Sequence, residues 1–193
     1  MLEAYEANGG YAGLRKAMEM SPADVVKLVC DSGLRGRGGA GFSTGFKWSV
    51  MPPIGESARP RYLACNFDEM EPGTFKDRYL VEGDPHQLIE GLMIAAYACR
   101  VDIGYIFIRG EYTRAQQILS RAMAEAADKG YIGKNILGKG WDCELHIHSS
   151  AGRYMCGEET GLLNALDGKP ANPRSKPPYP QTSGLWGKPT VVQ

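Results

Sequence analysis

Residues 33–48 read GLRGRGGAGFSTGFKW, and six of these sixteen residues are glycine. The only charged side chains in the stretch are Arg35, Arg37 and Lys47. Glycine lets the backbone adopt positive φ angles and lets main-chain N–H groups approach a ligand closely. Successive exposed amides flanked by guanidinium groups are suited to phosphate. The stretch therefore predicts a cradle for a nucleotide-like cofactor. A flexible linker is the alternative, although linkers usually carry Ser or Thr rather than Arg, Phe and Trp.

Gly36, Gly38 and Gly41 match the dinucleotide-binding pattern G-x-G-x-x-G. That pattern is informative only when a strand precedes it and a helix follows it. Here the preceding segment is typical of a helix, with Ser21 as N-cap and Pro22 at the first helical position. A helix followed by a loop is the wrong context for a Rossmann turn, and the chain contains no G-x-x-x-x-G-K-[ST] sequence. A nucleotide in this loop would be held by a different arrangement.

The composition limits the classes of protein to consider. The chain has 193 residues, 22 basic and 22 acidic side chains, and 43% hydrophobic residues. This length suits one domain with a substantial core, with or without a small appendage. A net charge of zero argues against a nucleic-acid-binding surface, which needs concentrated positive charge. No segment resembles a signal peptide, and no apolar run approaches the length of a membrane span.

Five cysteines, at positions 30, 65, 99, 143 and 156, form no C-x-x-C pair. Their odd number and spacing predict neither a disulfide framework nor a zinc or iron–sulfur ligand set. We expect buried, reduced thiols. His146 and His148 share one face of an expected strand, but no third ligand accompanies them, and we predict no metal site.

Alternating elements predict an α/β fold with layered helices and a mostly parallel sheet. Strands are expected at 62–65, 105–108 and 143–148, because these runs are short and apolar or alternating. The helices expected are two short ones within 1–20 and longer ones at 21–33, from 84 onward, at 112–129 and at 157–166. Residues 169–189 contain six prolines and are expected to form a loop. We expect two parts, a helical N-terminal segment at 1–33 and an α/β domain at 34–193.

An acidic loop follows the first expected strand. Asp68, Glu69 and Glu71 lie within four residues, and such crowding of like charge is unfavourable unless it serves another purpose. Carboxylates accept hydrogen bonds from ribose hydroxyls and repel the additional phosphate of NADP. Because ligands of open α/β sheets gather at the carboxyl ends of strands, a binding role is favoured over a solvated acidic turn.

Two later clusters carry polar groups of the same kind. Residues 152–160 read GRYMCGEET and join a strand to a helix, so the amides of residues 157–159 are expected to be unpaired donors at a helix N-terminus. For Glu158 alone, stabilisation of the helix dipole is the simpler interpretation. Residues 172–180, NPRSKPPYP, would either form a polyproline ligand for another domain or present Lys176 and Tyr179 to a bound cofactor. The sequence leaves these two alternatives equal.

Taken in order, these motifs carry a family resemblance. GLRGRGGAGFSTGFKW, CNFDEMEPGTFKDR, GYIFIRGEY, GRYMCGEETGLLNALDG and NPRSKPPYPQTSGLWGKPT closely resemble the flavoprotein subunit of NADH:quinone oxidoreductase, respiratory complex I, in its bacterial form. The resemblance covers essentially the whole chain. It extends to the diaphorase subunits of NAD-linked hydrogenases and formate dehydrogenases.

The resemblance implies a layered α/β FMN-binding domain with Rossmann-like elements that binds FMN and NAD(H). The glycine loop would cradle the flavin, the acidic loop and the 154–158 segment would surround it, and NADH would stack against Phe42. Glu159 would face a ribose and disfavour NADPH. The residues implied to contact the two nucleotides are Gly36, Arg37, Gly38, Gly39, Gly41, Phe42, Lys47, Asn66, Asp68, Glu69, Glu71, Tyr154, Gly157, Glu158, Glu159, Lys176 and Tyr179. No side chain is implied to act as acid or base, because hydride passes directly from nicotinamide to flavin.

The same resemblance implies partners and a location. Electrons would pass to iron–sulfur clusters and finally to quinone. The implied partners are a thioredoxin-like [2Fe–2S] subunit and the larger iron–sulfur subunit of a peripheral arm, on the cytoplasmic side of the inner membrane. Full-length relatives carry a [4Fe–4S] cluster in a C-terminal domain, and its ligands are not in this sequence. We therefore expect a fragment that ends before the β domain and the iron–sulfur domain. An inactive binding module is the alternative.

Overall fold

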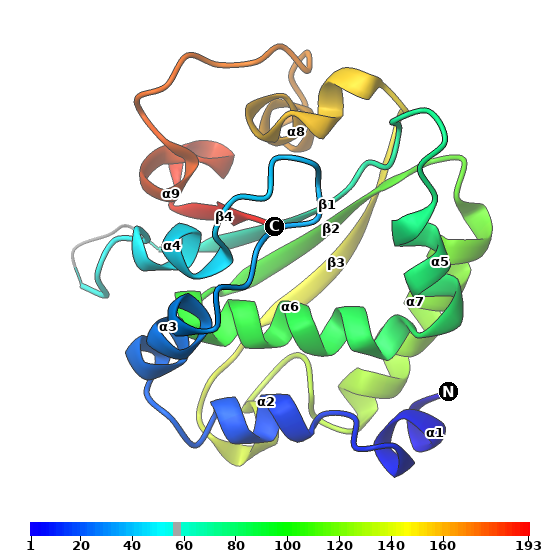
Figure 1. Cartoon of the computed structure of the whole chain (residues 1–193), viewed down its shortest axis with the longest axis vertical. Coiled ribbons are helices and arrows are strands. Elements are labelled where there is room, and N and C mark those ends of the chain that lie inside the picture. The colour runs from blue at the N-terminus through cyan, green and yellow to red at the C-terminus, as the bar shows by residue number, and fades with distance from the viewer. Residues whose placement is uncertain (56–58) are drawn as a thin grey trace.

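A computed structural model describes residues 1–55 and 59–193 and contains a four-stranded parallel sheet (Figure 1). The strands are β1 (Tyr62–Phe67), β2 (Ile103–Arg109), β3 (Glu144–Ser150) and β4 (Thr190–Val192), in the order β3-β2-β1-β4. The α/β class and the parallel pairing are confirmed. The three expected strands are present, and β1 continues through Asn66 and Phe67, which were expected in the loop. β4 was not predicted, because three residues after a proline-rich stretch show no periodicity.

Nine α-helices surround this sheet in the described part of the chain. They are α1 (Leu2–Ala7), α2 (Ala12–Ala17), α3 (Pro22–Asp31), α4 (Thr44–Ser49), α5 (Lys76–Gly83), α6 (Pro85–Cys99), α7 (Thr113–Asp128), α8 (Glu159–Leu166) and α9 (Pro180–Ser183). The sequence predicted the paired short helices at the start and α3, α6, α7 and α8, but not α4 or α5. The expectation that residues 169–189 form only a loop is wrong, because α9 lies within them.

The two faces of the sheet carry separate cores. Leu63, Cys65 and Ile106 face the larger core, which includes buried residues of α2, α3, α6 and α7. Ala64 and Phe107 face a smaller core shared with α8. Because successive side chains of a strand point to opposite faces, the apolar runs of β1 and β2 supply both cores at once.

The connections create a crevice at one edge of the sheet. The chain passes from β1 through α5 and α6 to β2, and from β2 through α7 to β3, moving away from β1 each time. It then returns through α8 to β4 on the other side of β1. The chain therefore leaves β1 toward one side of the sheet and reaches β4 on the other. Open α/β sheets bind ligands at such a switch in strand order, outside the carboxyl ends of the strands.

The helix before the glycine loop is fixed as its sequence indicates. Ser21 caps α3 by accepting a hydrogen bond from the Asp24 amide, and Gly33 ends the segment with a φ of +68°. A Cβ atom on Gly45 would lie 2.4 Å from the Cys30 amide nitrogen, so only glycine permits this approach of α4 to α3. The prediction of buried thiols is confirmed for four cysteines and wrong for Cys30, which is exposed.

The N-terminal residues pack on the helical layer. The amides of Tyr11 and Leu14 donate to the Glu90 carboxylate on α6, at 2.8 and 2.9 Å. The Tyr11 ring stacks on Tyr131 with 3.7 Å between the ring centroids. None of the described helices combines the length and the hydropathy needed to cross a membrane.

Candidate functional site

The glycine loop is a closed turn between α3 and α4. Arg35 and Ser43 form an antiparallel bridge, and the Gly36 amide donates to the Phe42 carbonyl at 2.9 Å. A Cβ atom on Gly38, Gly39 or Gly41 would meet nothing within 4 Å, so the space above the turn is open. The prediction that this segment lies outside a strand–turn–helix context is confirmed, since α3 precedes it.

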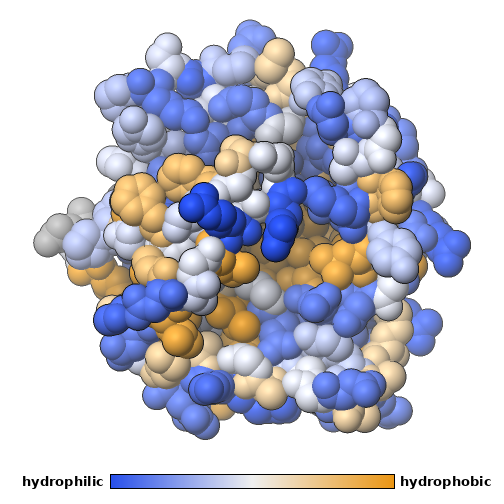
Figure 2. All heavy atoms as spheres, viewed as in Figure 1, coloured by the Kyte–Doolittle hydropathy of each residue, from blue (hydrophilic) through white to orange (hydrophobic). Residues whose placement is uncertain are grey.

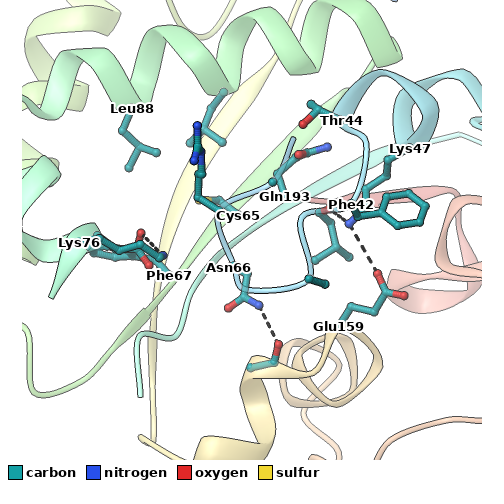
Figure 3. A pocket seen from close by; sticks show the side chains of 18 of the residues that line it. Phe42, Thr44, Lys47, Cys65, Asn66, Phe67, Lys76, Leu88, Glu159 and Gln193 are labelled. Atoms are coloured by element: carbon teal, nitrogen blue, oxygen red, sulfur yellow. Dashed lines mark hydrogen bonds and ion pairs between the residues drawn. The ribbon is translucent and has the colours of Figure 1, made fainter. Parts of the chain in front are cut away.

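A cleft opens between this loop and the carboxyl ends of β1 and β4 (Figure 3). It has a volume of about 420 Å³, within the range of about 300–1,000 Å³ typical of small-molecule sites. Figure 2 shows the same face of the molecule, where hydrophilic side chains stand over hydrophobic ones near the centre. Of the residues that the sequence predicts to contact the nucleotides, nine line this cleft: Gly36, Arg37, Gly38, Gly41, Phe42, Lys47, Asn66, Gly157 and Glu159.

A second hollow of about 610 Å³ adjoins the first. The two share Arg37, Gly38, Asn66 and Gly157, so we treat them together as one cleft and call it the nucleotide cleft, after the ligand that the sequence predicts there. The second hollow adds six more residues of the prediction: Gly39, Asp68, Glu69, Glu71, Tyr154 and Glu158. The segments that the sequence singled out separately therefore meet in one place.

Asn66 joins the end of β1 to the segment before α8. Its side-chain nitrogen donates to the Gly157 carbonyl at 2.9 Å, a bond that Figure 3 draws as a dashed line from Asn66. Its side-chain oxygen accepts from the Asp68 amide at 3.2 Å. Asn66 thus holds two walls of the nucleotide cleft at a fixed separation.

Two lysines and two glutamates alternate along one side of the cleft. The Lys47 ammonium donates to the Val192 carbonyl at 3.0 Å and lies 4.0 Å from the Glu159 carboxylate (Figure 3). Lys176 donates to Glu159 and lies 3.7 Å from Glu158. Burial lowers the pKa of Lys47, as does the charge of Lys176, while Glu159 opposes the shift. A half-buried cation with one carboxylate at 4.0 Å is suited to an additional anionic partner.

Asp68 is a buried carboxylate with an unsatisfied oxygen. It is 8% exposed, and its Oδ2 has no hydrogen-bond partner among the described residues. Burial raises its pKa to about 6, against the opposing effects of Arg109 and the Ser150 hydroxyl. Because buried polar atoms in proteins are nearly always paired, this oxygen is a place where a ligand donor would fit.

Two glutamates of the prediction are engaged in capping helices. Glu69 accepts from the amides of Asp77 and Arg78 at the start of α5, at 2.7 and 3.3 Å. Glu158 is the N-cap of α8 and accepts from the Thr160 and Gly161 amides, at 2.9 and 2.8 Å. The simpler interpretation of Glu158, as an acid stabilising its helix, describes this contact. The expectation of unpaired amides at residues 157–159 is wrong for Glu158, whose amide donates to the Met155 carbonyl at 3.2 Å.

Two of the three predicted aromatic residues line the cleft, and the third does not. Tyr154 donates to Glu71 at 2.6 Å across the cleft, and Phe42 lies beneath Lys47 with 5.6 Å from the ring centroid to the ammonium nitrogen. Tyr179 is 56% exposed and does not line either hollow. The structure thus brings together all the predicted residues except Tyr179, with Lys176 attached through its ion pairs.

Lys76 and Asp77 line both hollows and were missed from the sequence. The Lys76 ammonium donates to Asp77 Oδ1 at 2.6 Å, and burial raises the pKa of Asp77. Gln193 also lines the cleft, with a buried side-chain nitrogen that has no partner among the described residues. The sequence signal for Lys76 and Asp77 was their place in the motif CNFDEMEPGTFKDR, directly after the acidic loop.

The remaining candidate ligands lie apart. His146 lies 3.4 Å from Glu144, and His148 stacks on Phe107 with 5.2 Å between ring centroids. Among residues 1–55 and 59–193, no three His, Cys, Asp or Glu side chains are grouped so as to hold a metal ion.

Comparison with known proteins decides the family. Residues 29–193 match the sequence model of the Nuo51 FMN-binding domain. The chain belongs to the Nuo51 FMN-binding domain family. Among relatives of this family, it is 59% identical over 192 residues to an NADH-quinone oxidoreductase subunit of Salmonella typhimurium. It is 53% identical over 191 residues to the corresponding subunit of Aquifex aeolicus. The alignments cover 99% of this chain and 43% and 44% of those relatives, so the chain spans less than half of their length.

A solved structure shares the Nuo51 FMN-binding fold. The H2-reduced crystal structure of an NAD+-reducing [NiFe]-hydrogenase superposes with a TM-score of 0.80 and 42% sequence identity. The match covers 92% of this chain and 29% of the hydrogenase chain. Both NADH-quinone oxidoreductases and an NAD-linked hydrogenase, which the sequence motifs resemble, are therefore found among its relatives.

Proposed function

We propose that this chain is the FMN- and NADH-binding part of an NADH dehydrogenase flavoprotein. The observation that carries the proposal is the convergence of three distant segments on one cleft. The glycine loop, the end of β1 and the start of α8 meet there through the Asn66–Gly157 hydrogen bond and the approach of Lys47 to Glu159. The family match and the NADH-quinone oxidoreductase relatives support the same function.

The residues present fit a flavin mononucleotide. The open space above Gly38, Gly39 and Gly41 admits a group close to the main chain. The buried Asp68 Oδ2 offers an acceptor to a ring N–H, and Lys47 offers a cation to a phosphate. In this assignment Gly36, Arg37, Gly38, Gly39, Gly41, Lys47, Asn66, Asp68 and Gly157 hold the flavin nucleotide. Glu69 and Glu158 act through the helices that they cap.

NADH is assigned to the outer part of the cleft. Phe42 supplies a ring for stacking, and Glu71 and Tyr154 close the cleft mouth through their hydrogen bond. Glu159 accepts ribose hydroxyls and disfavours a 2′-phosphate, and Lys176 and Tyr179 contact the remainder of the nucleotide. Bound FMN supplies the redox chemistry, accepting hydride from NADH and passing electrons on one at a time. The chain supplies the orientation of the two rings and the charges around them.

In this proposal the functional division of the chain lies near residue 33. Residues 34–193 carry the nucleotide cleft, and residues 1–33 brace the helical layer. The electrons would pass to partner subunits with iron–sulfur clusters and on to quinone, within a peripheral arm on the cytoplasmic side of the membrane. The thioredoxin-like [2Fe–2S] subunit and the larger iron–sulfur subunit are the partners proposed.

A second candidate is a diaphorase subunit of an NAD-linked hydrogenase or formate dehydrogenase. The superposition on the NAD+-reducing hydrogenase at a TM-score of 0.80 favours it. The higher identity to the NADH-quinone oxidoreductase relative, 59% against 42%, places it second. The subunits that copurify with the protein from its host distinguish the two.

The experiment is an anaerobic titration of the chain with FMN, followed by NADH. We expect quenching of flavin fluorescence at one FMN per chain and bleaching of the flavin absorbance when NADH is added. A folded chain that binds FMN but is not bleached by NADH is the inactive binding module of the alternative. A folded chain that leaves flavin fluorescence unchanged contradicts the proposal.

A further inference from the structure

A second cleft lies behind the segment that joins β3 to α8. Residues 154–157 form a 3-10 turn, whose Tyr154 and Gly157 line the nucleotide cleft. Met155 and Cys156, in the same turn, line a separate hollow of about 750 Å³, which we call the rear cleft. The rear cleft also includes His148, Ser149, Ser150 and Lys169, and it does not share a residue with the nucleotide cleft. A single turn of backbone therefore separates the two.

Two polar side chains, one from each cleft, contact each other next to this turn. Asp68 lines the nucleotide cleft, and Ser150 lines the rear cleft. The Ser150 hydroxyl lies 3.5 Å from Asp68 Oδ1 and accepts from the Gly152 amide at 3.3 Å. Both side chains are nine-tenths buried, at 8% and 6% exposure. The other carboxyl oxygen, Oδ2, has no partner among the described residues.

The charged groups around Asp68 do not neutralise it. Arg109, at the end of β2, donates to Glu111 at 3.3 Å and to the Glu69 carbonyl at 3.0 Å. Glu111 opposes the influence of Arg109 on Asp68, and Cys156 from the 3-10 turn is a buried thiol whose pKa is itself raised. The neighbouring Glu69 carboxylate is bound to the start of α5. Arg109 and the Ser150 hydroxyl offset the effect of burial only in part, so the pKa of Asp68 is raised to about 6.

We propose that Asp68 is the proton-holding group of the nucleotide cleft, that Ser150 positions it, and that protons reach it from solvent through the rear cleft. The inference rests on the proposed function, because reduction of a flavin by NADH consumes one hydride and one proton. The hydride comes from NADH, which leaves as NAD+. When FMN is bound, Asp68 would give this proton from its carboxyl group to the reduced flavin, become a carboxylate, and regain a proton from solvent on the Ser150 side. Nucleotides that cover the mouth of the nucleotide cleft then do not block its proton supply.

The first test uses the chain without nucleotide. The Asp68 carboxyl carbon is followed by carbon-13 NMR as pH is varied, with its signal assigned by its loss in Asp68→Asn. We expect a midpoint near pH 6 in the wild type, because burial raises this pKa to about 6. Ser150→Ala should move it higher, since the hydroxyl favours the carboxylate. Ser149→Ala, the matched control in the same strand and the same cleft, should leave it unchanged.

A titration midpoint near pH 4 in the wild type overturns the proposal. So does a Ser150→Ala variant that titrates like Ser149→Ala. Ser150→Thr keeps the hydroxyl and should restore the wild-type midpoint, which separates loss of the hydrogen bond from loss of packing. None of these measurements requires FMN to bind, so they stand even where the proposed function fails.

The second test measures proton uptake in the FMN-loaded chain with a pH indicator during rapid reduction. We expect Ser150→Ala to slow proton uptake about tenfold while its FMN affinity stays within about twofold of wild type. Ser149→Ala should behave as wild type. Equal uptake rates in the two serine variants contradict a route through the rear cleft. Failure of the wild-type chain to bind FMN contradicts the proposed function instead, and the NMR result then decides the role of Asp68.

Discussion

Glu90 and Asp68 are equally buried carboxylates, each 8% exposed, with opposite surroundings. Glu90, where the N-terminal helices pack on α6, accepts hydrogen bonds from the Tyr5 hydroxyl and from the Tyr11 and Leu14 amides. Asp68, at the end of β1, has one weak contact and one unsatisfied oxygen. A satisfied buried carboxylate holds a fold together, whereas an unsatisfied one costs stability and marks a place for a ligand. The comparison separates the packing of the N-terminal helices on α6, which Glu90 stabilises, from the candidate ligand site at the end of β1, which contains Asp68.

Removing Glu90 should produce the largest loss of stability. Glu90→Ala leaves two buried amides without an acceptor, each costing roughly 1–3 kcal/mol. We therefore expect the free energy of unfolding in urea to fall by about 4 kcal/mol. Glu90→Gln keeps one acceptor oxygen and should lose less. If the free energy of unfolding of Glu90→Ala falls by less than about 1 kcal/mol, the hydrogen bonds to Glu90 do not stabilise the fold as proposed.

Removing the charge of Asp68 should raise the free energy of unfolding instead of lowering it, by an amount that depends on pH. Its pKa is raised in the folded chain to about 6, so the folded state binds more protons than the unfolded state between about pH 4 and pH 6. The stability that this group contributes is present at low pH and is lost as pH rises through 6. Asp68→Asn should thus gain about 2 kcal/mol relative to wild type between pH 4 and pH 7, as measured by urea unfolding at each pH. A constant difference across that range contradicts the raised pKa.

A variant of Lys47 tests FMN binding in the cleft without disturbing the packing of the N-terminal helices on α6. Its charge is partly buried with its pKa lowered, so Lys47→Met should change the free energy of unfolding by less than about 1 kcal/mol. FMN affinity, measured by fluorescence quenching, should fall at least about tenfold, because the proposal places this cation against the phosphate. Lys27→Met, which removes an exposed lysine on α3, is the matched control and should bind FMN as wild type does. Equal affinity in the two variants would remove Lys47 from the site.

The smallest expected effect concerns nucleotide choice. Lys176 is paired with Glu159, so Glu159→Gln removes one negative charge and releases a lysine that can bind a 2′-phosphate. We expect NADPH-driven flavin reduction to rise about fivefold relative to NADH, roughly 1 kcal/mol. The double variant Glu159→Gln, Lys176→Gln should lose most of this gain. An unchanged ratio of NADPH to NADH use in Glu159→Gln would remove its role in specificity.

Much of the architecture could be predicted because it depends on local pattern. The apolar runs that became β1 and β2, and the Ser21–Pro22 start of α3, follow directly from periodicity and capping. Placing Asp68 and Gly157 near each other also needed only the rule that carboxyl ends of parallel strands meet at one edge. The short strand β4 and the helices α4, α5 and α9 were missed, because elements this short, within or next to glycine- and proline-rich segments, carry too little pattern.

The partners of individual side chains could not be predicted. Glu69, Glu158 and Asp68 are all acids at the ends of elements, yet two cap helices and one is left unsatisfied. Sequence alone does not distinguish these outcomes, because each depends on which backbone amides tertiary packing brings within reach. The same holds for Gly45, whose need for glycine comes from the Cys30 backbone on another helix.

The measurement that tests the central claim most directly is the binding of FMN to the folded chain and its dependence on the glycine loop. Gly38→Val fills the open space above the loop, where a Cβ atom meets nothing within 4 Å and therefore leaves the fold intact. We expect the wild-type chain to quench flavin fluorescence at one FMN per chain and Gly38→Val to bind at least about tenfold more weakly, with unchanged urea unfolding. Equal FMN affinity in two equally stable chains would contradict the assignment of this cleft.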